Sequence, residues 1–123
     1  MPIDVVLAKI EREGQRGKEY LFVREKGQKH YKLPGGAVSK DEDHVTALMR
    51  EVKEETGASV VDYGTEETCK VEKPPIGVLQ LHIYTGVKIN GEPVPGCEVE
   101  EIQWFDADFA KQNRYYIQPE QKK

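Results

Sequence analysis

Cysteine is scarce in this sequence, and its scarcity excludes two kinds of small stabilised fold. Only Cys69 and Cys97 occur among the 123 residues. A secreted domain held by a disulfide framework normally carries more cysteines. Neither residue belongs to a CxxC or CxxH pattern that would indicate a zinc site. We therefore expect two reduced thiols.

Long hydrophobic runs are also missing. The longest apolar stretch near the N-terminus, Val5 to Ala8, is far shorter than the roughly 20 residues that a membrane-spanning helix needs. No basic segment precedes it, as one does in a secretory signal peptide. We expect a cytoplasmic protein with no membrane partner.

An excess of positive charge is the third absence. The chain has 18 basic and 22 acidic residues, a formal charge of -4, and no local basic patch. A broad contact with nucleic acid phosphates is therefore not expected, so the sequence predicts no nucleic acid polymer as partner. The length of 123 residues and the 37% of hydrophobic residues are typical of one domain, residues 1–123.

The chain consists of strand-like segments interrupted by one well-marked helix. Residues 3–12 and 18–25 are rich in strand-forming residues and flank a QRG turn, so they predict a hairpin. Beyond the helix we expect two strands around a turn at 58–64 and 65–72, a long strand at 76–89, a loop at 90–96, a last strand at 98–105, a short helix at 106–112 and a frayed tail at 118–123. This order lacks the regular strand–helix alternation of a doubly wound sheet. We predict an α/β protein of the α+β kind, with a mixed sheet flanked by helices.

The helix lies between a start signal and a stop signal. Ser39 and Glu42 have the spacing of a capping box at a helix N-terminus, and Gly57 supplies a C-terminal stop. Apolar residues recur at helical spacing between these signals and predict one stripe that faces the core. They are Val45, Leu48, Met49 and Val52.

The opposite face of this helix is acidic. Glu51, Glu54 and Glu55 lie three and four positions apart, so their carboxylates share about one turn and repel each other. One interpretation is a solvated face that basic neighbours partly neutralise. The other is a site for a hard divalent cation such as Mg2+, which prefers carboxylate and carbonyl oxygens. The glycine pair Gly35 and Gly36 just upstream can present a bare carbonyl to the same ion.

The stretch that holds these residues resembles the signature of the Nudix hydrolase family. From Gly36 it reads GAVSKDEDHVTALMREVKEETGA, where the signature is Gx5Ex7REUxEExGU with U a bulky aliphatic residue. Ala58 departs from the pattern, because Ile, Leu or Val is usual there. The matching positions of this box, residues 36–58, are Gly36, Glu42, Arg50, Glu51, Val52, Glu54, Glu55 and Gly57. On either side, YKLPGG and EVEEIQWFD look like the family's lead-in and late strand.

The resemblance implies a fold, a reaction and a cofactor. The fold is an α/β/α sandwich with a mixed sheet, in which the box forms a loop, a helix and a loop. The reaction is hydrolysis of a diphosphate bond in a nucleoside diphosphate linked to another group, and it requires Mg2+ or Mn2+. The expected partner is a small nucleotide, and the expected state is a monomer or a homodimer.

The substrate stays open at this level. The compact chain resembles the MutT-like members, which act on nucleoside triphosphates or modified nucleotides. Pro74 stands near where members that hydrolyse ADP-ribose often carry a proline, so ADP-ribose or a nucleotide sugar is an alternative. RNA decapping is not expected of an acidic chain. An alternative of another class is a non-catalytic module that binds a nucleotide and regulates a partner, which loss of a box glutamate would favour; none is lost.

Carried over to this sequence, the resemblance assigns roles inside the box. Glu51, Glu54 and Glu55 are the implied metal ligands, together with the carbonyl of Gly35. Glu51 and Glu54 also belong to the implied catalytic set, and Arg50 orients a glutamate within it. Glu51 is one candidate for the general base.

Roles outside these residues are also implied. Glu42 has a supporting role near the metal, or it only caps the helix, and both can hold. Gly36 and Arg24 are the candidates for contacts with the substrate, Arg24 with a phosphate. A late acidic residue commonly serves the family as a further metal ligand or as the general base. Glu98 aligns best with it, in competition with Glu100 and Glu101.

The remaining candidates receive no catalytic role. Trp104 is expected in the core rather than as a stacking platform. The three histidines have no spacing typical of metal ligands, so we assign them no chemistry: His30, His44 and His82.

Overall fold

The structure of the protein is a computed structural model that describes residues 2–121. Its strands are β1 (Ile3–Gly14), β2 (Gly17–Glu25), β3 (Tyr31–Lys32), β4 (Gly35–Ala37), β5 (Ser59–Asp62), β6 (Glu66–Lys73), β7 (Gly77–Asn90), β8 (Val99–Asp106) and β9 (Tyr116–Ile117). Its helices are α1 (His44–Thr56), α2 (Ala107–Gln112) and the 3-10 helix Pro119–Gln121.

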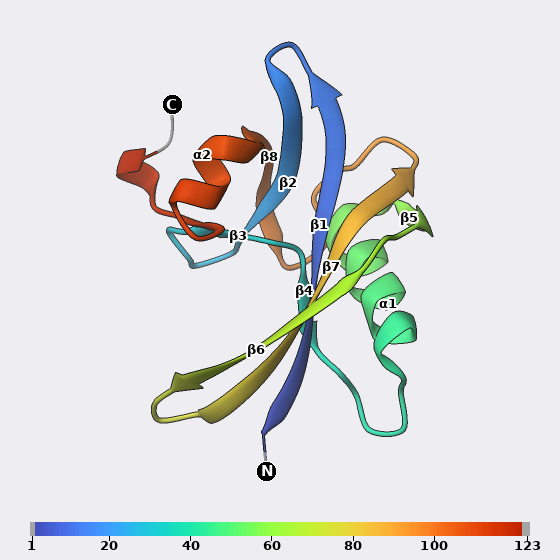
Figure 1. Cartoon of the computed structure of the whole chain (residues 1–123), viewed down its shortest axis with the longest axis vertical. Coiled ribbons are helices and arrows are strands. Elements are labelled where there is room, and N and C mark those ends of the chain that lie inside the picture. Colours follow the sequence, from blue (N-terminus) through green and yellow to red (C-terminus); the bar gives the residue numbers. More distant parts are fainter. Residues whose placement is uncertain (1, 122–123) are drawn as a thin grey trace.

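Strand β1 organises the sheet (Figure 1). One edge of β1 runs parallel to β7. The other edge is antiparallel first to β4, at Val5–Leu7, and then to β2, at Glu11–Gly14. Beyond these neighbours, β2 pairs with β8 and β3, while β7 pairs with β5 and β6. The sheet is therefore mixed, as the sequence predicted.

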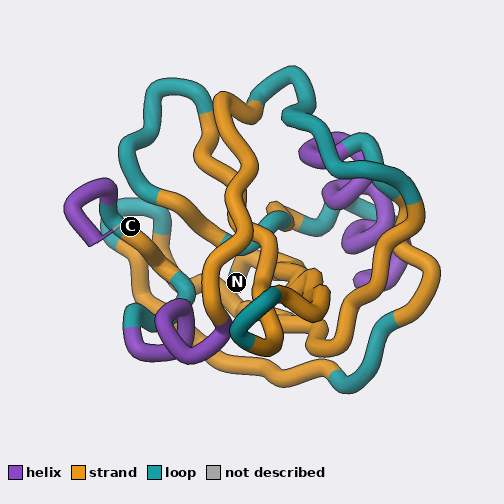
Figure 2. Tube along the Cα trace, turned by 90° about the horizontal axis from the view of Figure 1, so that it is seen from above, coloured by secondary structure: helices purple, strands orange, loops and turns teal. Residues whose placement is uncertain are grey.

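Each face of β1 has its own core, because side chains alternate along a strand. Val6, Ala8 and Ile10 are fully buried in the core that α1 covers. Leu7, between them, packs against the second core, which contains Ala110 of α2. Figures 1 and 2 show α1 and α2 on opposite sides of the strands. The predicted α/β/α sandwich is confirmed.

Several predicted elements have different partners or ends in the structure. The hairpin of β1 and β2 is confirmed, with Gly14 opposite Gly17. The two strands expected around a turn at 58–64 and 65–72 are present as β5 and β6, and both pair with the long strand β7, at different points along it. The segment 98–105 is not the last strand, since β9 follows α2 and pairs with β3.

The C-terminal segment is also more ordered than predicted. Residues 119–121 of the expected frayed tail form a 3-10 helix, and residues 122 and 123 lie outside the described residues. Cys69 and Cys97 are exposed and unpaired. Within residues 2–121, no helix combines the length and the apolar character that a membrane crossing requires.

The helix begins later than the capping-box pattern predicted. Asp43 is the N-cap of α1, and its side chain accepts a hydrogen bond of 2.7 Å from the backbone N–H of Thr46. Ser39 lies outside the helix, where its own N–H donates to Glu42. The reason is that Glu42 is bound by Arg50 and therefore belongs to the loop. The helix ends at Gly57 with φ 74, as predicted.

The apolar stripe of α1 is narrower than predicted. Leu48 and Val52 are fully buried, and Val45 packs against the same core. The prediction that Met49 lies in the core is wrong, because 43% of this residue is exposed. Ala47, which the periodicity did not include, is buried in its place. A small residue there lets the helix approach the sheet closely.

We predict that a substitution of the N-cap residue lowers the free energy of unfolding. Asp43→Ala removes the acceptor for the Thr46 N–H and should lower the free energy of unfolding by about 1 kcal/mol. Ser39→Ala leaves the backbone hydrogen bonds of Ser39 intact, so its effect should stay within about 0.5 kcal/mol. Urea denaturation of both variants beside the parent protein measures the difference. Equal losses would contradict the assignment of the cap to Asp43.

Candidate active site

The site begins where β4 lies against α1. The backbone N–H of Gly35 donates a hydrogen bond of 3.0 Å to Oε1 of Glu55. Gly35 has φ 148, and a side chain there would overlap the carbonyl oxygen of Val6. At Gly36, a Cβ atom would lie 2.5 Å from the Glu51 carboxylate. The glycine at position 35 therefore allows β4 to approach β1 closely, and the glycine at position 36 allows the backbone to approach the Glu51 carboxylate.

The three glutamates of α1 differ strongly in exposure. Glu55 is buried, with 7% of the residue exposed. The Glu51 side chain is 14% exposed, and the Glu54 side chain is 57% exposed. The three carboxylates therefore lie on one helix face and differ in depth: Glu55 is in the interior beside Gly35, Glu51 is partly exposed, and Glu54 is in solvent.

Arg50 connects this face to the loop before the helix. Its Nε and Nη2 donate to the Glu42 carboxylate over 2.8 and 3.0 Å. Its Nη1 donates to Glu51 over 3.2 Å and to Glu54 over 3.3 Å. One guanidinium thus fixes three carboxylates at once. The structure places Glu42 in this network and not in the helix cap.

Lys32 is a site residue that the sequence analysis missed. Its Nζ donates to the carbonyl oxygen of Gly35 over 3.3 Å, and it lies 3.8 Å from the Glu25 carboxylate. Its charge lowers the pKa of both Glu51 and Glu55, against the effect of burial. The signal was present in YKLPGG, where a lysine stands three positions before the first glycine, but only the fold shows that its ammonium group reaches the Gly35 carbonyl.

The electrostatics of the glutamates follow from burial. Burial raises the pKa of Glu55 to about 7, although Lys32 and the Gly35 N–H oppose the shift. Burial also raises the pKa of Glu51. The hydrogen bonds from Arg50 lower the pKa of Glu42 to about 2.

These shifts fit a divalent cation. Burial disfavours the charged forms of Glu51 and Glu55, and the charges of Arg50 and Lys32 offset this effect only in part. A cation beside the two carboxylates removes the remaining cost. The available donors are carboxylate oxygens and the Gly35 carbonyl, the types that Mg2+ and Mn2+ prefer. The residues that offer these donor atoms are Gly35, Glu51, Glu54 and Glu55.

The late acidic residues separate into two environments. Glu101 of β8 lies opposite Arg24 of β2. Its carboxylate accepts a hydrogen bond of 2.7 Å from the Tyr31 hydroxyl and one of 3.4 Å from Arg24. Arg24 also donates to the carbonyl of Gln28. Both Glu101 and Arg24 are therefore engaged with each other.

Glu98 has more freedom than Glu101. It is exposed, and the loop before it is fastened to α1 because the Gly96 N–H donates to the Glu55 carbonyl over 3.0 Å. The Glu98 carbonyl accepts from Lys26. Among residues 2–121, no hydrogen bond or ion pair joins the Glu98 carboxylate to the glutamates of α1. The structure brings the segment to the helix and leaves the carboxylate free. Glu100 is exposed on β8.

Three residues without an assigned site role also have defined positions. Trp104 is partly buried against the core under α1, and the Arg12 guanidinium lies 4.2 Å from its ring. Two of the histidines, His44 and His82, come together with Asp4. No sequence spacing indicated this group, because its members come from three separate elements.

Known proteins resemble this chain in sequence and in fold. The chain matches the NUDIX domain family over residues 1–123. Over 89 residues it is 32% identical to the m7GpppN-mRNA hydrolase of Saccharomyces cerevisiae, a match to 70% of this chain and 9% of that protein. Over 88 residues it is 30% identical to a Mycobacterium tuberculosis protein named "Putative 8-oxo-dGTP diphosphatase 2", a match to 63% of this chain and 62% of that one.

A solved structure shares the fold. The crystal structure of a MutT NUDIX hydrolase from Burkholderia pseudomallei matches with a TM-score of 0.76 and 24% identity, covering 88% of this chain and 85% of that chain. The chain spans less than two thirds of either sequence relative, 9% of the yeast protein and 62% of the mycobacterial one.

The buried carboxylate gives a prediction about stability and pH. Because the pKa of Glu55 rises from 4.5 to about 7 on folding, the folded metal-free protein holds this proton more tightly than the unfolded chain. Its free energy of unfolding should therefore fall as the pH rises through this range, by up to about 3 kcal/mol. Glu55→Gln, which mimics the protonated form and keeps the acceptor for Gly35, should not show this loss.

The measurement is urea denaturation in EDTA at pH values from 4.5 to 7. Glu54→Gln is the matched control, since it removes the same charge from an exposed position of the same helix. Parent and Glu55→Gln curves that stay parallel over the whole range would contradict the prediction.

Proposed function

The chain belongs to the NUDIX domain family, and on this basis we propose that the protein is a metal-dependent pyrophosphohydrolase. It cleaves a diphosphate bond in a nucleoside diphosphate linked to another group. The observation that carries the proposal is the complete carboxylate set. Glu51, Glu54 and Glu55 line one helix face, Arg50 orients two of them, and the Gly35 backbone lies against the third.

The proposed cofactor is Mg2+ or Mn2+, held by the Gly35 carbonyl and by Glu51, Glu54 and Glu55. When bound, such an ion neutralises diphosphate charge and acidifies water. Every other contribution comes from the chain. The Lys32 ammonium donates a hydrogen bond to the Gly35 carbonyl in the structure. We propose that it contacts a phosphate when substrate is bound.

Two residues compete for the role of general base. Glu51 is mostly buried, and burial raises its pKa, so its carboxylate is a stronger base than that of an exposed glutamate. Glu98 is exposed on a loop fastened to the end of α1 and is the alternative, either as base or as a further metal ligand. Arg50 keeps Glu51 and Glu54 in place during the attack on phosphorus, and Glu42 in turn holds Arg50.

Contacts with the substrate are proposed at two further positions. Gly36 leaves the surface beside Glu51 bare, which allows a diphosphate to approach the carboxylate. Arg24 contacts a substrate phosphate, and Glu101 holds its guanidinium in a fixed orientation until then.

The favoured substrate class is a nucleoside triphosphate or a modified nucleotide. The name of the mycobacterial relative, a diphosphatase of 8-oxo-dGTP, supports it. ADP-ribose or a nucleotide sugar is the alternative, on the strength of Pro74. The name of the yeast relative describes mRNA hydrolysis, but the match is confined to 9% of that protein. The charge of -4 favours a small nucleotide over a polymer. A cytoplasmic monomer or homodimer completes the proposal.

We predict that hydrolysis depends on metal. Metal-free protein in excess EDTA should release no phosphate or pyrophosphate from dNTPs, 8-oxo-dGTP, ADP-ribose, dinucleoside polyphosphates or nucleotide sugars. Mg2+ or Mn2+ should restore activity, and Glu54→Gln should lower turnover by orders of magnitude. Full hydrolysis in EDTA would refute metal dependence. Nucleotide binding without turnover on any substrate would instead favour the regulatory module.

A second prediction concerns the late loop. Glu98→Gln should reduce turnover strongly, because the substitution removes the proposed base or metal ligand from the segment that is fastened to the end of α1. Glu100→Gln is the control, since it changes a neighbouring exposed glutamate of β8. Glu101→Gln should raise KM rather than lower kcat, because it releases Arg24. Steady-state rates on the best substrate measure all three, and parental rates in Glu98→Gln remove this residue from the mechanism.

A further inference from the structure

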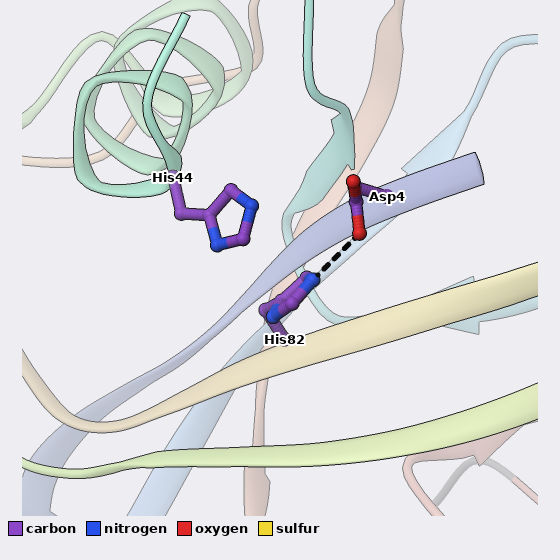
Figure 3. Close-up of side chains that lie close together, drawn as sticks. All are labelled: Asp4, His44 and His82. Atoms are coloured by element: carbon purple, nitrogen blue, oxygen red, sulfur yellow. Dashed lines mark hydrogen bonds and ion pairs between the residues drawn. The ribbon is translucent and has the colours of Figure 1, made fainter. Parts of the chain in front are cut away.

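A second polar cluster lies at the N-terminal end of α1, away from the glutamates. His82 on β7 is its centre. Nε2 of His82 lies 2.9 Å from Oδ1 of Asp4 on β1, and Nδ1 lies 2.6 Å from Oε2 of Glu66 on β6. The ring of His44, the first residue of α1, lies 4.0 Å from the His82 ring, centroid to centroid. Figure 3 shows Asp4, His44 and His82 converging from three elements.

The sheet explains why these groups meet. Val6 lies beside His82 in the parallel pair of β1 and β7, and Asp4 is two residues before Val6 on the same face. This is the face that α1 covers. His82 is 8% exposed, so the cluster closes the core at the point where the helix begins.

We propose that Asp4, His44 and His82 bind a Zn2+ ion. Each residue offers one ligand atom, and these atoms all lie within 4.8 Å of one another. Ligands in a tetrahedral zinc site, with bonds of about 2.0–2.1 Å, lie roughly 3.3 Å apart. The Nε2 to Oδ1 distance of 2.9 Å already approaches this spacing. His44 supplies the remaining movement, since its side chain is 34% exposed and can rotate.

The donor set determines the kind of ion. Imidazole nitrogen suits Zn2+ and other transition metals, whereas Mg2+ prefers oxygen ligands. The cluster therefore selects a different ion from the carboxylates of the active site. Two imidazoles and one carboxylate leave a fourth position of the tetrahedron to water.

Glu66 is the outer partner of this site. The ligating histidine of a zinc site usually donates its other ring N–H to a carboxylate, which fixes the tautomer. Glu66 is placed for this role, 2.6 Å from Nδ1 of His82, so that Nε2 is directed at Asp4 and the ion. Nδ1 of His44 also lies 3.9 Å from Oε2 of Glu66. A purely structural network of these histidines and carboxylates does not bind Zn2+, and this difference separates the two interpretations.

The zinc site and the proposed active site are separable. His44 precedes Glu51 by seven positions on α1, which is a rise of about 10 Å along the helix. Zinc bound at the cluster joins the start of α1 to β1 and β7. It should stabilise the fold by an amount that grows with the logarithm of the ratio of Zn2+ concentration to Kd, without a role in hydrolysis.

The experiment titrates the metal-stripped chain with Zn2+ in excess Mg2+, which on the proposed function occupies the active-site carboxylates. Calorimetry gives stoichiometry and Kd, thermal melts give the shift in Tm, and Co2+ absorption reports tetrahedral nitrogen coordination. We expect one Zn2+ per chain and a higher Tm. His44→Gln should weaken binding by about 100-fold or more, and Glu66→Gln by about 10- to 100-fold.

Controls keep the outcome decisive. His30→Gln removes a histidine that stacks on Tyr116, outside the cluster, and should bind Zn2+ as the parent does. We choose His44→Gln because a substitution of the buried His82 is expected to disturb folding. The His44→Gln variant should retain Mg2+-dependent hydrolysis. Equal Zn2+ affinity in the parent and in His44→Gln would overturn the proposal. So would loss of Zn2+ binding in the double variant Glu54→Gln and Glu55→Gln, which keeps the cluster intact.

Discussion

The hydrogen bond from the Gly35 N–H to the buried carboxylate of Glu55 is the contact on which the candidate site depends. It fastens β4, and through β4 the central strand β1, to the second half of α1. A buried carboxylate is costly unless it is paired, and here a backbone amide and the Lys32 charge compensate only part of that cost. The site is therefore organised around negative charge that the protein alone does not neutralise.

The consequences spread outward along α1. Glu51 is less buried than Glu55, and Glu54 is exposed. Arg50 ties both to Glu42, so the loop before the helix and the helix face form one network. The single helix presents a hard oxygen site at one end and the imidazole cluster of His44 and His82 at the other.

Most of the site could be predicted from local sequence, because its main residues lie within one helix and the loop that leads to it. Spacing along a helix fixes which side chains share a face, so Arg50, Glu51 and Glu54 needed no tertiary information. The predicted N-cap was wrong because it also rested on spacing along the chain alone. Ser39 and Glu42 have the spacing of a capping box, but the Glu42 carboxylate accepts a hydrogen bond from Arg50, and Asp43 is the N-cap of α1.

The sequence by itself determined the family resemblance, the acidic helix face, the β1–β2 hairpin and the glycines beside the helix. Each of these rests on neighbours within about 20 residues along the chain. The tertiary structure alone decided that Lys32 contacts the Gly35 carbonyl, that Glu101 engages Arg24 and Tyr31, and that β5 and β6 share β7. It alone brought Asp4, His44 and His82 together, because parallel pairing of β1 with β7 joins residues far apart in sequence, and no local spacing records such pairing.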